Sequence, residues 1–476
     1  MNGLADVGVW GLGTMGANLA LNAAEHGFRV ALGNRTPERA ARLAATHARE
    51  PWGANLHACA GAADFVAALE PPRRVLLLVP AGAAVDESIE VLLPHLHGGD
   101  VLADGGNSLW SDTRRRQVGL RERRVAFVGL GVSGGEQGAR RGPSLMGGGD
   151  PVAWARLEPV LEAIAARGAF GACFTRVGPD GAGHFAKMVH NGIEYADMQL
   201  LAESCDLLRR GLGLSAAQAA DVFAEWNKGP LESFLLDLAA RVLRRRDART
   251  GRPLVDLVLD AAAQKGTGRW TVQVAGELSV PVPTLAAAVD ARTLSADRAA
   301  RQAAAARLSG PGGGSAPLAE ARDGWIEGVR QALTAGRLCA WAQGFQLLAA
   351  ASHAHDWSLQ PAELARIWTG GCILRARVLN AIRQAFLDQP GLSNLALAPE
   401  FARALAEAQL GWRAVVATGA QHGLPLPALS ASLSWYDTVR AAELPTYLIQ
   451  AQRDAFGAHR FVRRDDPEGK PTHAEW

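Results

Sequence analysis

The sequence contains few cysteines, and they do not form a disulfide framework. The five that it has lie far apart, with no CxxC pair among them. An odd, widely spaced set of cysteines is a poor basis for structural disulfides. We therefore expect free thiols that mostly fill the core, at Cys59, Cys173, Cys205, Cys339 and Cys372.

The chain also lacks an excess of charge and a long apolar run. Its 49 basic and 47 acidic residues give a formal charge of only +2, too little for a general attraction to nucleic acid. No apolar run approaches the roughly 20 residues that cross a membrane. The first residues show no basic flank, apolar stretch and cleavage site in series. We therefore expect a cytoplasmic protein that has neither nucleic acid nor membrane as a partner.

The arrangement of apolar residues predicts an α/β region followed by an all-α region. Up to about residue 178, helical stretches alternate with short β-rich runs at residues 7–10, 28–34, 75–79, 101–104 and 125–129. This alternation predicts a doubly wound parallel sheet of the Rossmann type. After Gly183, segments with helical spacing continue almost to Leu433, broken by turn clusters such as residues 309–317, which we expect to form a surface loop.

These changes in pattern divide the chain into three predicted regions. Residues 1–180 form the Rossmann domain, and residues 181–438 form a large helical domain. Residues 439–476 are too polar and interrupted for another core helix, so we expect an extended tail that packs against something else. At 476 residues the chain is long enough for more than one core. No internal repeat is evident on inspection of the sequence.

A glycine-rich motif follows the first expected strand: Gly11-Leu12-Gly13-Thr14-Met15-Gly16. In such a motif the first glycine permits a tight turn, and the second lets backbone N–H groups approach a pyrophosphate. The third lets the helix pack close to the strand. A glycine-rich segment can be only a turn, but its place at the first strand-to-helix junction favours a bound dinucleotide, held by the helix N-terminus.

The end of the second expected strand favours NADP over NAD. Its residues are Asn34, Arg35 and Thr36, at the position where an NAD-binding protein usually has an acidic side chain. A carboxylate would repel a 2′-phosphate, whereas Arg35 can hold one through its planar fork of donors and Thr36 can add a hydroxyl. The alternative is that Arg35 is an ordinary solvated charge at the end of a strand.

A predicted helix that begins near Gly183 carries five functional side chains on one face. At about 100° per residue they fall within an arc of roughly 140°. They are Lys187, His190, Asn191, Glu194 and Tyr195. Such a face can also be a wet surface with a Lys–Glu pair.

The run from Lys187 to Tyr195 resembles the catalytic signature of the 6-phosphogluconate dehydrogenase family. Further segments resemble the same family in the same order along the chain. They are residues 104–108, 131–140, 225–229, 264–270, 370–373 and 448–454. The resemblance covers nearly the whole chain and implies the long-chain form of an NADP-dependent, decarboxylating dehydrogenase that acts on 6-phosphogluconate.

The resemblance also implies roles for individual residues. Lys187 would be the general base and then an acid, and Glu194 would be the acid that protonates the enediol. The substrate carboxylate and hydroxyls would be held by Ser133, Gly134, Gly135, His190 and Asn191, and Asn107 would also bind the substrate. The phosphate would be held by Tyr195, Lys265, Thr267, Arg292, Arg453 and His459. For the cofactor the resemblance adds Val79, Pro80, Ala81 and Asn107 to the glycine motif and the strand end. No metal is implied, and the tail would reach a second subunit of a homodimer.

One departure from the family pattern concerns the cofactor. Pro80 stands where long-chain relatives usually carry Lys, which removes a charge and an N–H group from one expected contact.

Three alternatives remain at this stage. A β-hydroxyacid dehydrogenase would share the glycine motif but not Lys265, Arg292, Arg453 or the tail. A non-catalytic NADP sensor would share the scaffold, although the presence of both Lys187 and Glu194 argues against it. A metal site over residues 353–356 (His-Ala-His-Asp) has only its spacing in its favour.

Overall fold

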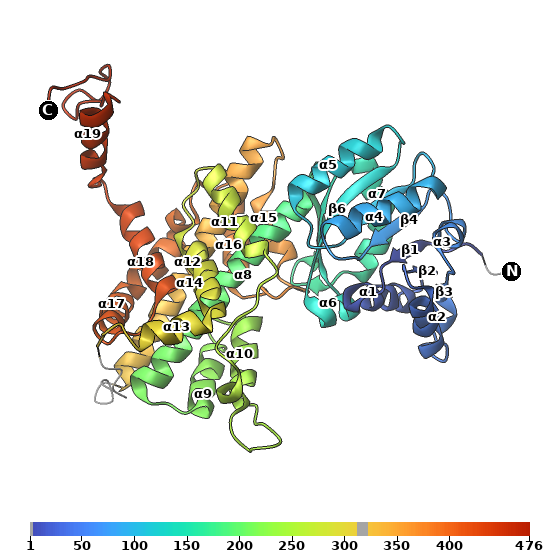
Figure 1. Cartoon of the computed structure of the whole chain (residues 1–476), viewed down its shortest axis with the longest axis horizontal. Coiled ribbons are helices and arrows are strands. Elements are labelled where there is room, and N and C mark those ends of the chain that lie inside the picture. Colours follow the sequence, from blue (N-terminus) through green and yellow to red (C-terminus); the bar gives the residue numbers. More distant parts are fainter. Residues whose placement is uncertain (1–2, 312–321) are drawn as a thin grey trace.

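The computed structural model describes residues 3–311 and 322–476 (Figure 1). The loop expected over residues 309–317 therefore lies mostly outside the described residues. Apart from the two gaps, the chain forms an N-terminal α/β domain and a large helical domain, and a smaller C-terminal segment projects from the latter.

The N-terminal domain is built on one eight-stranded sheet with the order β10-β7-β6-β5-β4-β1-β2-β3. Its strands are β1 (Val7–Trp10), β2 (Val30–Gly33), β3 (Leu56–Ala58), β4 (Arg74–Leu77), β5 (Val101–Asp104), β6 (Ala126–Ser133), β7 (Ser144–Gly148) and β10 (Phe174–Gly178). The first six strands are parallel, whereas β7 is antiparallel to β6 and β10 is parallel to β7. A separate two-stranded ribbon joins β8 (Arg167–Gly168) and β9 (Gly171–Ala172).

Helices cover both faces of this sheet, as the Rossmann prediction required. They are α1 (Thr14–Glu25), α2 (Pro37–Thr46), α3 (Ala62–Ala67), α4 (Ala83–Leu92), α5 (Trp110–Arg121), α6 (Gly135–Arg141) and α7 (Pro151–Ile164), with short 3-10 turns at Gly53–Asn55 and Leu93–His95. Successive residues of β1 point to opposite faces. Val7 and Val9 pack in one core with α1 and α7, whereas Trp10 packs in a second core with α3 and α4.

Five strands were predicted close to their observed bounds, but β3, β7 and β10 were not predicted. The strand β7 ends in Gly147 and Gly148, which resemble a turn in the sequence. In the structure a side chain at Gly147 would overlap the ring of Trp154, and one at Gly148 would overlap the backbone at Gly183. The glycines therefore let α7 and the first turn of α8 (Ala182–Asp206) approach the sheet.

The helical domain is arranged around α8 and α14 (Arg322–Ala354), which pack against each other. The other helices of the domain are α9 (Ala216–Trp226), α10 (Phe234–Arg244), α11 (Thr267–Glu277), α12 (Pro283–Ala296), α13 (Arg298–Ala305), α15 (Pro361–Ile367), α16 (Val378–Asp388), α17 (Pro399–Gln421) and α18 (Pro427–Arg440). A π-helical turn (Leu207–Gly211) follows α8, and 3-10 turns occur at Leu254–Leu257 and Leu395–Leu397. Every residue of α8 from Ala182 to Ile193 is buried.

The two halves of the helical domain resemble each other, which inspection of the sequence had missed. Gln-Leu-Leu-Ala occurs at residues 199–202 in α8 and again at residues 346–349 in α14, and Pro-x-Pro-x-Leu occurs at 281–285 and 425–429. Each half also supplies an acceptor to the other. Glu203 in α8 accepts the N–H groups of Ala428 and Leu429 at the start of α18, and Gln343 in α14 accepts that of Thr284 at the start of α12. We call these contacts the reciprocal caps.

The C-terminal segment contains a helix that the sequence reading did not predict. This helix, α19 (Thr446–Gly457), stands away from the rest of the chain (Figure 1). Large apolar side chains on it are exposed, among them Tyr447, Leu448, Ile449 and Phe456. Its fold is organised by the buried carboxylate of Asp454, which accepts hydrogen bonds from the segment that follows.

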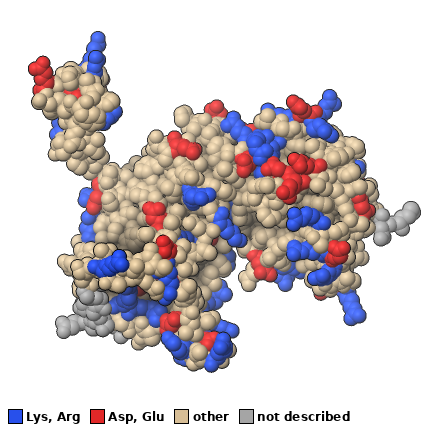
Figure 2. Space-filling model, viewed as in Figure 1, with Lys and Arg blue, Asp and Glu red and all other residues tan. Residues whose placement is uncertain are grey.

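The surface and the helices agree with the charge and hydropathy of the sequence. Basic and acidic side chains lie intermixed on the face seen in Figure 2. Within residues 3–311 and 322–476, no helix is both long enough and apolar enough to cross a membrane.

Candidate active site

The glycine motif forms an open turn between β1 and α1. Gly11 has a φ of +101°, and a side chain there would lie 2.7 Å from the carbonyl oxygen of Leu78. A side chain at Gly16 would overlap the Gly11 carbonyl. At Gly13, by contrast, no atom lies within 4 Å of an added Cβ, so the start of α1 faces open space. Gly13 is the N-cap residue, and no side chain caps the helix. This geometry fits a pyrophosphate at the helix N-terminus.

At the strand end next to this turn, Asn34 shapes the turn, whereas Arg35 and Thr36 face outward. Asn34 accepts the Leu12 N–H at 3.0 Å and donates to the carbonyl of Thr36 at 3.1 Å, so it fixes the shape of the glycine turn. Arg35 and Thr36 are exposed beside the turn. Their donors are therefore accessible to a phosphate on the ribose of a dinucleotide. Pro80 and Ala81 are also exposed, after the end of β4, and Val79 is half-buried.

A tight turn after β5 holds Asn107 at the same edge of the sheet. The buried carboxylate of Asp104 accepts the Gly106 N–H at 2.9 Å and the Ser108 hydroxyl at 2.6 Å. Asn107 itself is exposed between these two anchored residues. The turn therefore presents the Asn107 amide without using it for its own stability.

A buried polar cluster lies where α8 crosses the end of β6. The Lys187 amine donates to the Ser133 hydroxyl at 3.1 Å and lies 3.4 Å from His190 Nδ1. His190 Nε2 lies 3.2 Å from the same hydroxyl, and the Asn191 amide oxygen lies 3.2 Å from Nδ1. The wet-surface alternative for this helix face is wrong, since Lys187 is only 6% exposed and His190 is fully buried.

Burial determines the protonation of this cluster. Loss of water lowers the pKa of the Lys187 amine, and the ionised forms of Glu194 and Cys372 would oppose this only in part. Burial also holds the pKa of His190 well below its usual value, an effect that the Lys187 charge increases. Both pKa shifts are in the direction of the neutral amine and the neutral imidazole, the forms that can accept a proton.

Glu194 has the opposite tendency. Burial raises the pKa of its carboxyl, whereas Lys187 and Arg292 lower it. One carboxyl oxygen lies 4.0 Å from His190 Nδ1. A carboxyl with a raised pKa near a lysine with a lowered pKa is the arrangement expected of an acid and a base in one site.

The next turn of α8 meets α11 and α12. The guanidinium of Arg292 lies 3.6 Å from the centroid of the Tyr195 ring. A side chain at Gly268 would overlap that ring, and Thr267 is buried beside it at the start of α11. The structure therefore brings Tyr195, Thr267 and Arg292 together.

Two of the residues expected at the site, Arg453 and His459, are not brought into it within the single chain. Lys265 is exposed in the loop before α11. Arg453 and His459 belong to the projecting segment and are exposed there (Figure 1).

Gly134 and Gly135 lie at the start of α6, and both have positive φ, +112° and +60°.

The sequence reading missed two residues that touch this site. His184 bridges the two domains, because Nε2 lies 3.0 Å from the Asp104 carbonyl and Nδ1 lies 2.6 Å from the Thr113 hydroxyl. Since a carbonyl only accepts, Nε2 carries the proton and Nδ1 accepts from Thr113. The second residue, Cys372, is buried near Lys187, and burial raises the pKa of its thiol to about 12. Cys372 lies in residues 370–373, one of the segments that resemble the family, and this was the available signal.

The possible metal site over residues 353–356 has another explanation. The ring of His355 packs 4.7 Å from that of Trp110 and 4.8 Å from that of Trp357. In the part of the chain that the structure describes, no three His, Cys, Asp or Glu side chains group so as to hold a metal ion.

A dinucleotide fold joined to a helix that buries a lysine beside a carboxyl fits the class of pyridine-nucleotide-dependent dehydrogenases. Two family models match the chain: the NAD binding domain of 6-phosphogluconate dehydrogenase over residues 6–178, and the 6-phosphogluconate dehydrogenase C-terminal domain over residues 183–476. The chain therefore belongs to the 6-phosphogluconate dehydrogenase family.

Individual relatives agree over the whole length. A decarboxylating 6-phosphogluconate dehydrogenase of Synechococcus elongatus is 50% identical over 99% of both chains. An NADP(+)-dependent, decarboxylating 6-phosphogluconate dehydrogenase of Bacillus subtilis is 46% identical over 99% of this chain and 98% of its own. The solved 6-phosphogluconate dehydrogenase of Plasmodium falciparum, described with NADP+ and with 6-phosphogluconate, aligns with a TM-score of 0.94 at 37% identity, covering 99% of this chain and 100% of that one.

The family membership confirms the resemblance seen in the sequence. It also decides against the β-hydroxyacid dehydrogenase alternative, because the match includes the second half of the helical domain and the C-terminal segment.

Proposed function

We propose that this chain catalyses the NADP-dependent oxidative decarboxylation of 6-phosphogluconate to ribulose 5-phosphate and carbon dioxide. The observation that carries the proposal is the buried Lys187 amine, 3.1 Å from the Ser133 hydroxyl and on the same helix face as Glu194. Relatives that match along the whole chain carry the name of this activity.

The glycine turn and the strand end fit NADP. The free N–H groups at the start of α1 suit the pyrophosphate, and Arg35 and Thr36 suit the 2′-phosphate. When bound, NADP supplies the acceptor for the hydride that leaves C3 of the substrate. Val79, Pro80 and Ala81 would contact NADP, but without the positive charge of the lysine that relatives usually carry at position 80.

Lys187 moves the protons of the first two steps. As a neutral amine it takes the proton of the substrate 3-hydroxyl, and the product is a 3-keto acid. Such an acid loses carbon dioxide when the resulting enolate is stabilised, and the charge on protonated Lys187 provides this stabilisation. Protonated Lys187 gives its proton to the enolate oxygen, which forms the enediol. Glu194, whose carboxyl pKa is raised by burial, then gives its proton to C1 while the neutral Lys187 amine takes the proton of the enediol hydroxyl, so that the ketose forms.

Other side chains position the substrate. Its carboxylate and hydroxyls face Asn107, Ser133, Gly134, Gly135, His190 and Asn191 in our proposal. The phosphate needs several cationic or hydroxyl donors, which Tyr195, Lys265, Thr267 and Arg292 provide. Arg453 and His459 of the partner subunit complete this set.

The partner is a second copy of this chain, and the exposed apolar face of α19 supports that part of the proposal. Tyr447 is 66% exposed and Phe456 is 76% exposed, although both lie on a helix with an ordered buried carboxylate. A helix with such a face needs a surface to cover it. We also propose the division of the chain at residues 180 and 438, with the last region as the shared tail, and a cytoplasmic location.

The test is the formation of NADPH and carbon dioxide from 6-phosphogluconate by three proteins. We expect Lys187→Ala to lose both products while still binding the substrate, because the proton acceptor is gone but the anchors remain. We expect Arg35→Ala to weaken NADP binding about 10-fold to 100-fold and to leave NAD binding nearly unchanged, since a charge-assisted pair with the 2′-phosphate is lost.

Two exposed residues serve as matched controls, Lys228→Ala and Arg123→Ala. Retention of turnover in Lys187→Ala would contradict the assigned base. Binding of NADP by the wild type without any product would instead favour a non-catalytic sensor.

A further inference from the structure

A buried ion pair lies on the catalytic helix one turn beyond Glu194. Asp197 in α8 and Arg337 in α14 are joined through Nε–Oδ1 at 2.5 Å and Nη2–Oδ2 at 3.1 Å. The two side chains are 9% and 8% exposed. None of the roles assigned above uses this pair.

The guanidinium of Arg337 has further partners in the segment before α10. Its Nη1 donates to the Leu231 carbonyl and its Nη2 to the Ser233 hydroxyl, both at 3.1 Å. Ser233 pairs with Ala376 through the backbone, and Phe234 donates its N–H to the carbonyl of Arg375. One planar cation therefore joins α8, α14 and a strand-like contact that leads to the loop with Cys372.

Asp197 is close to Glu194 because residues three apart on a helix are neighbours, with Cβ atoms about 5 to 6 Å apart. The charged or titratable groups that act on Glu194 are Lys187 and His190 from its own helix, Arg292 from α12, and Asp197. The carboxylate of Asp197 is the like charge in this set, and Arg337 is its counter-ion.

We propose that Asp197 and Arg337 are positioning residues for the proposed acid Glu194: they fix its turn of α8 and set the local charge that it meets. This inference rests on the proposed function. A buried ion pair is seldom needed for stability alone, since apolar residues of similar volume often serve as well. Its position one turn from the proposed proton donor therefore points to a role in the chemistry.

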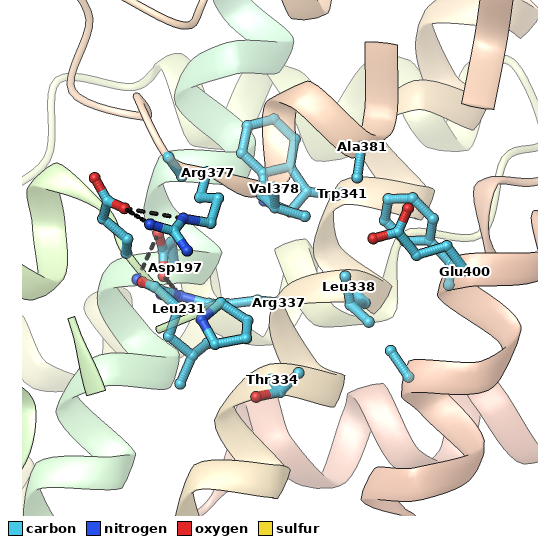
Figure 3. Close-up of a pocket in the computed structure, with 15 residues that line it drawn as sticks. Asp197, Leu231, Thr334, Arg337, Leu338, Trp341, Arg377, Val378, Ala381 and Glu400 are labelled. Atoms are coloured by element: carbon cyan, nitrogen blue, oxygen red, sulfur yellow. Dashed lines mark hydrogen bonds and ion pairs between the residues drawn. The ribbon is translucent and has the colours of Figure 1, made fainter. Parts of the chain in front are cut away.

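The far side of Arg337 supports this view. The guanidinium lies in the wall of a cavity of about 170 Å³ whose other walls include Leu338, Trp341 and Phe401 (Figure 3). Glu232, Arg377 and Glu400 also line this cavity, but Asp197 and Arg337 are themselves nearly inaccessible to water, which screens their charges poorly. Removal of either charge should therefore be felt at Glu194. The cavity also gives a small cation room to replace a truncated Arg337 side chain.

The first test compares the pH profiles of kcat for wild type, Asp197→Asn, Arg337→Gln and the double variant. Loss of Asp197 leaves an unpaired cation, which favours the carboxylate form of Glu194. We expect the fall in kcat at high pH to move down by about half to one pH unit. Arg337→Gln should move it up by a similar amount, and the double variant should return it to within about 0.3 of the wild-type position.

If the pair were purely structural, the single variants would have a lower Tm, but the pH at which kcat falls would not shift in opposite directions. That result would overturn the proposal. If the protein does not fold after either charge is removed, Arg337→Lys is the conservative variant to use. This variant keeps the positive charge but loses the bidentate geometry of the guanidinium. We therefore expect kcat to fall at the same high pH as in the wild type, with its maximum lowered about tenfold. An unchanged kcat in this variant would count against the positioning role.

The second test uses the cavity. Guanidinium ion at non-denaturing concentration should raise the kcat of Arg337→Ala at least about threefold, because it can pair with Asp197 bidentately. Urea, which has the same shape without the charge, should not. Equal effects of urea and guanidinium, or no effect of either, would speak against the proposal.

Glu194→Gln separates this inference from the proposed function. A Glu194→Gln enzyme with full turnover and an unchanged pH profile would show that the assignment of the acid is wrong. If Glu194→Gln loses turnover while Asp197→Asn and Arg337→Gln keep the wild-type pH limb, only the role of the ion pair is wrong.

Discussion

The position of the Lys187 amine, the proposed base, can be tested with a single methyl group at Gly131. This glycine lies in β6 directly under α8, where an added Cβ would lie 2.6 Å from Lys187 Cβ and 3.0 Å from the Gly183 carbonyl oxygen. Non-bonded carbon atoms keep about 3.5 to 4.0 Å between them. Gly131→Ala must therefore move Lys187 by about 1 Å.

A displacement of this size is expected to slow the reaction strongly. A 1 Å misplacement of reacting groups can cost about 100-fold in rate, or about 2.7 kcal/mol of activation free energy. We expect kcat of Gly131→Ala to fall by about this factor, with the KM for NADP nearly unchanged because the glycine turn is separate from the contact. The assay is steady-state NADPH formation at saturating substrate, with Tm measured in parallel.

The matched control is Gly119→Ala, since no atom lies within 4 Å of a Cβ at that position on the exposed side of α5. It should keep the wild-type kcat. If kcat of Gly131→Ala lay within about threefold of the wild-type value at unchanged Tm, the claim that displacing Lys187 slows the reaction would be refuted.

Three further predictions concern pH, stability and assembly. Because burial lowers the pKa of Lys187 and raises that of Glu194, kcat of the wild type should rise as the amine loses its proton and fall as the carboxyl loses its own, and Glu194→Gln should lack the fall at high pH. Burial raises the pKa of Glu203 to about 7 from 4.5, so its contribution to folding is complete below about pH 4.5 and is lost as pH rises through 7. This loss amounts to about 3 kcal/mol, and Glu203→Gln should flatten that part of the stability curve in urea unfolding at a series of pH values. Tyr447→Asp with Ile449→Asp should shift the protein toward monomer in sedimentation and abolish turnover while NADP still binds, whereas an unchanged dimer would contradict the role given to α19.

The sequence predicted those elements whose signal is local. The strands β1 and β5 were predicted at their observed bounds, because each is a short apolar run with turn residues on both sides. The face of α8 with Lys187, His190 and Glu194 followed from helical periodicity alone. The glycine turn was recognisable because it directly follows β1.

Features that depend on contacts between distant segments were not predicted. Ser133 reaches Lys187 from 54 residues away, and Arg337 reaches Asp197 from 140 residues away. The strand β7 was missed because its glycines serve the approach of α7 and α8, which no local pattern reveals. The helix α19 was missed because Pro445 and the charged residues around it resemble an irregular tail.

The reciprocal caps have a consequence for how the chain matures during synthesis. The first turn of α12 obtains its acceptor from Gln343, which lies 59 residues after Thr284. The first turn of α18 obtains its acceptors from Glu203 in the other half. Each half therefore needs the other to provide hydrogen-bond acceptors for backbone N–H groups at the start of one of its helices. The first half must therefore wait on the ribosome until α14 has emerged, and a fragment that stops before it has no complete native state to reach.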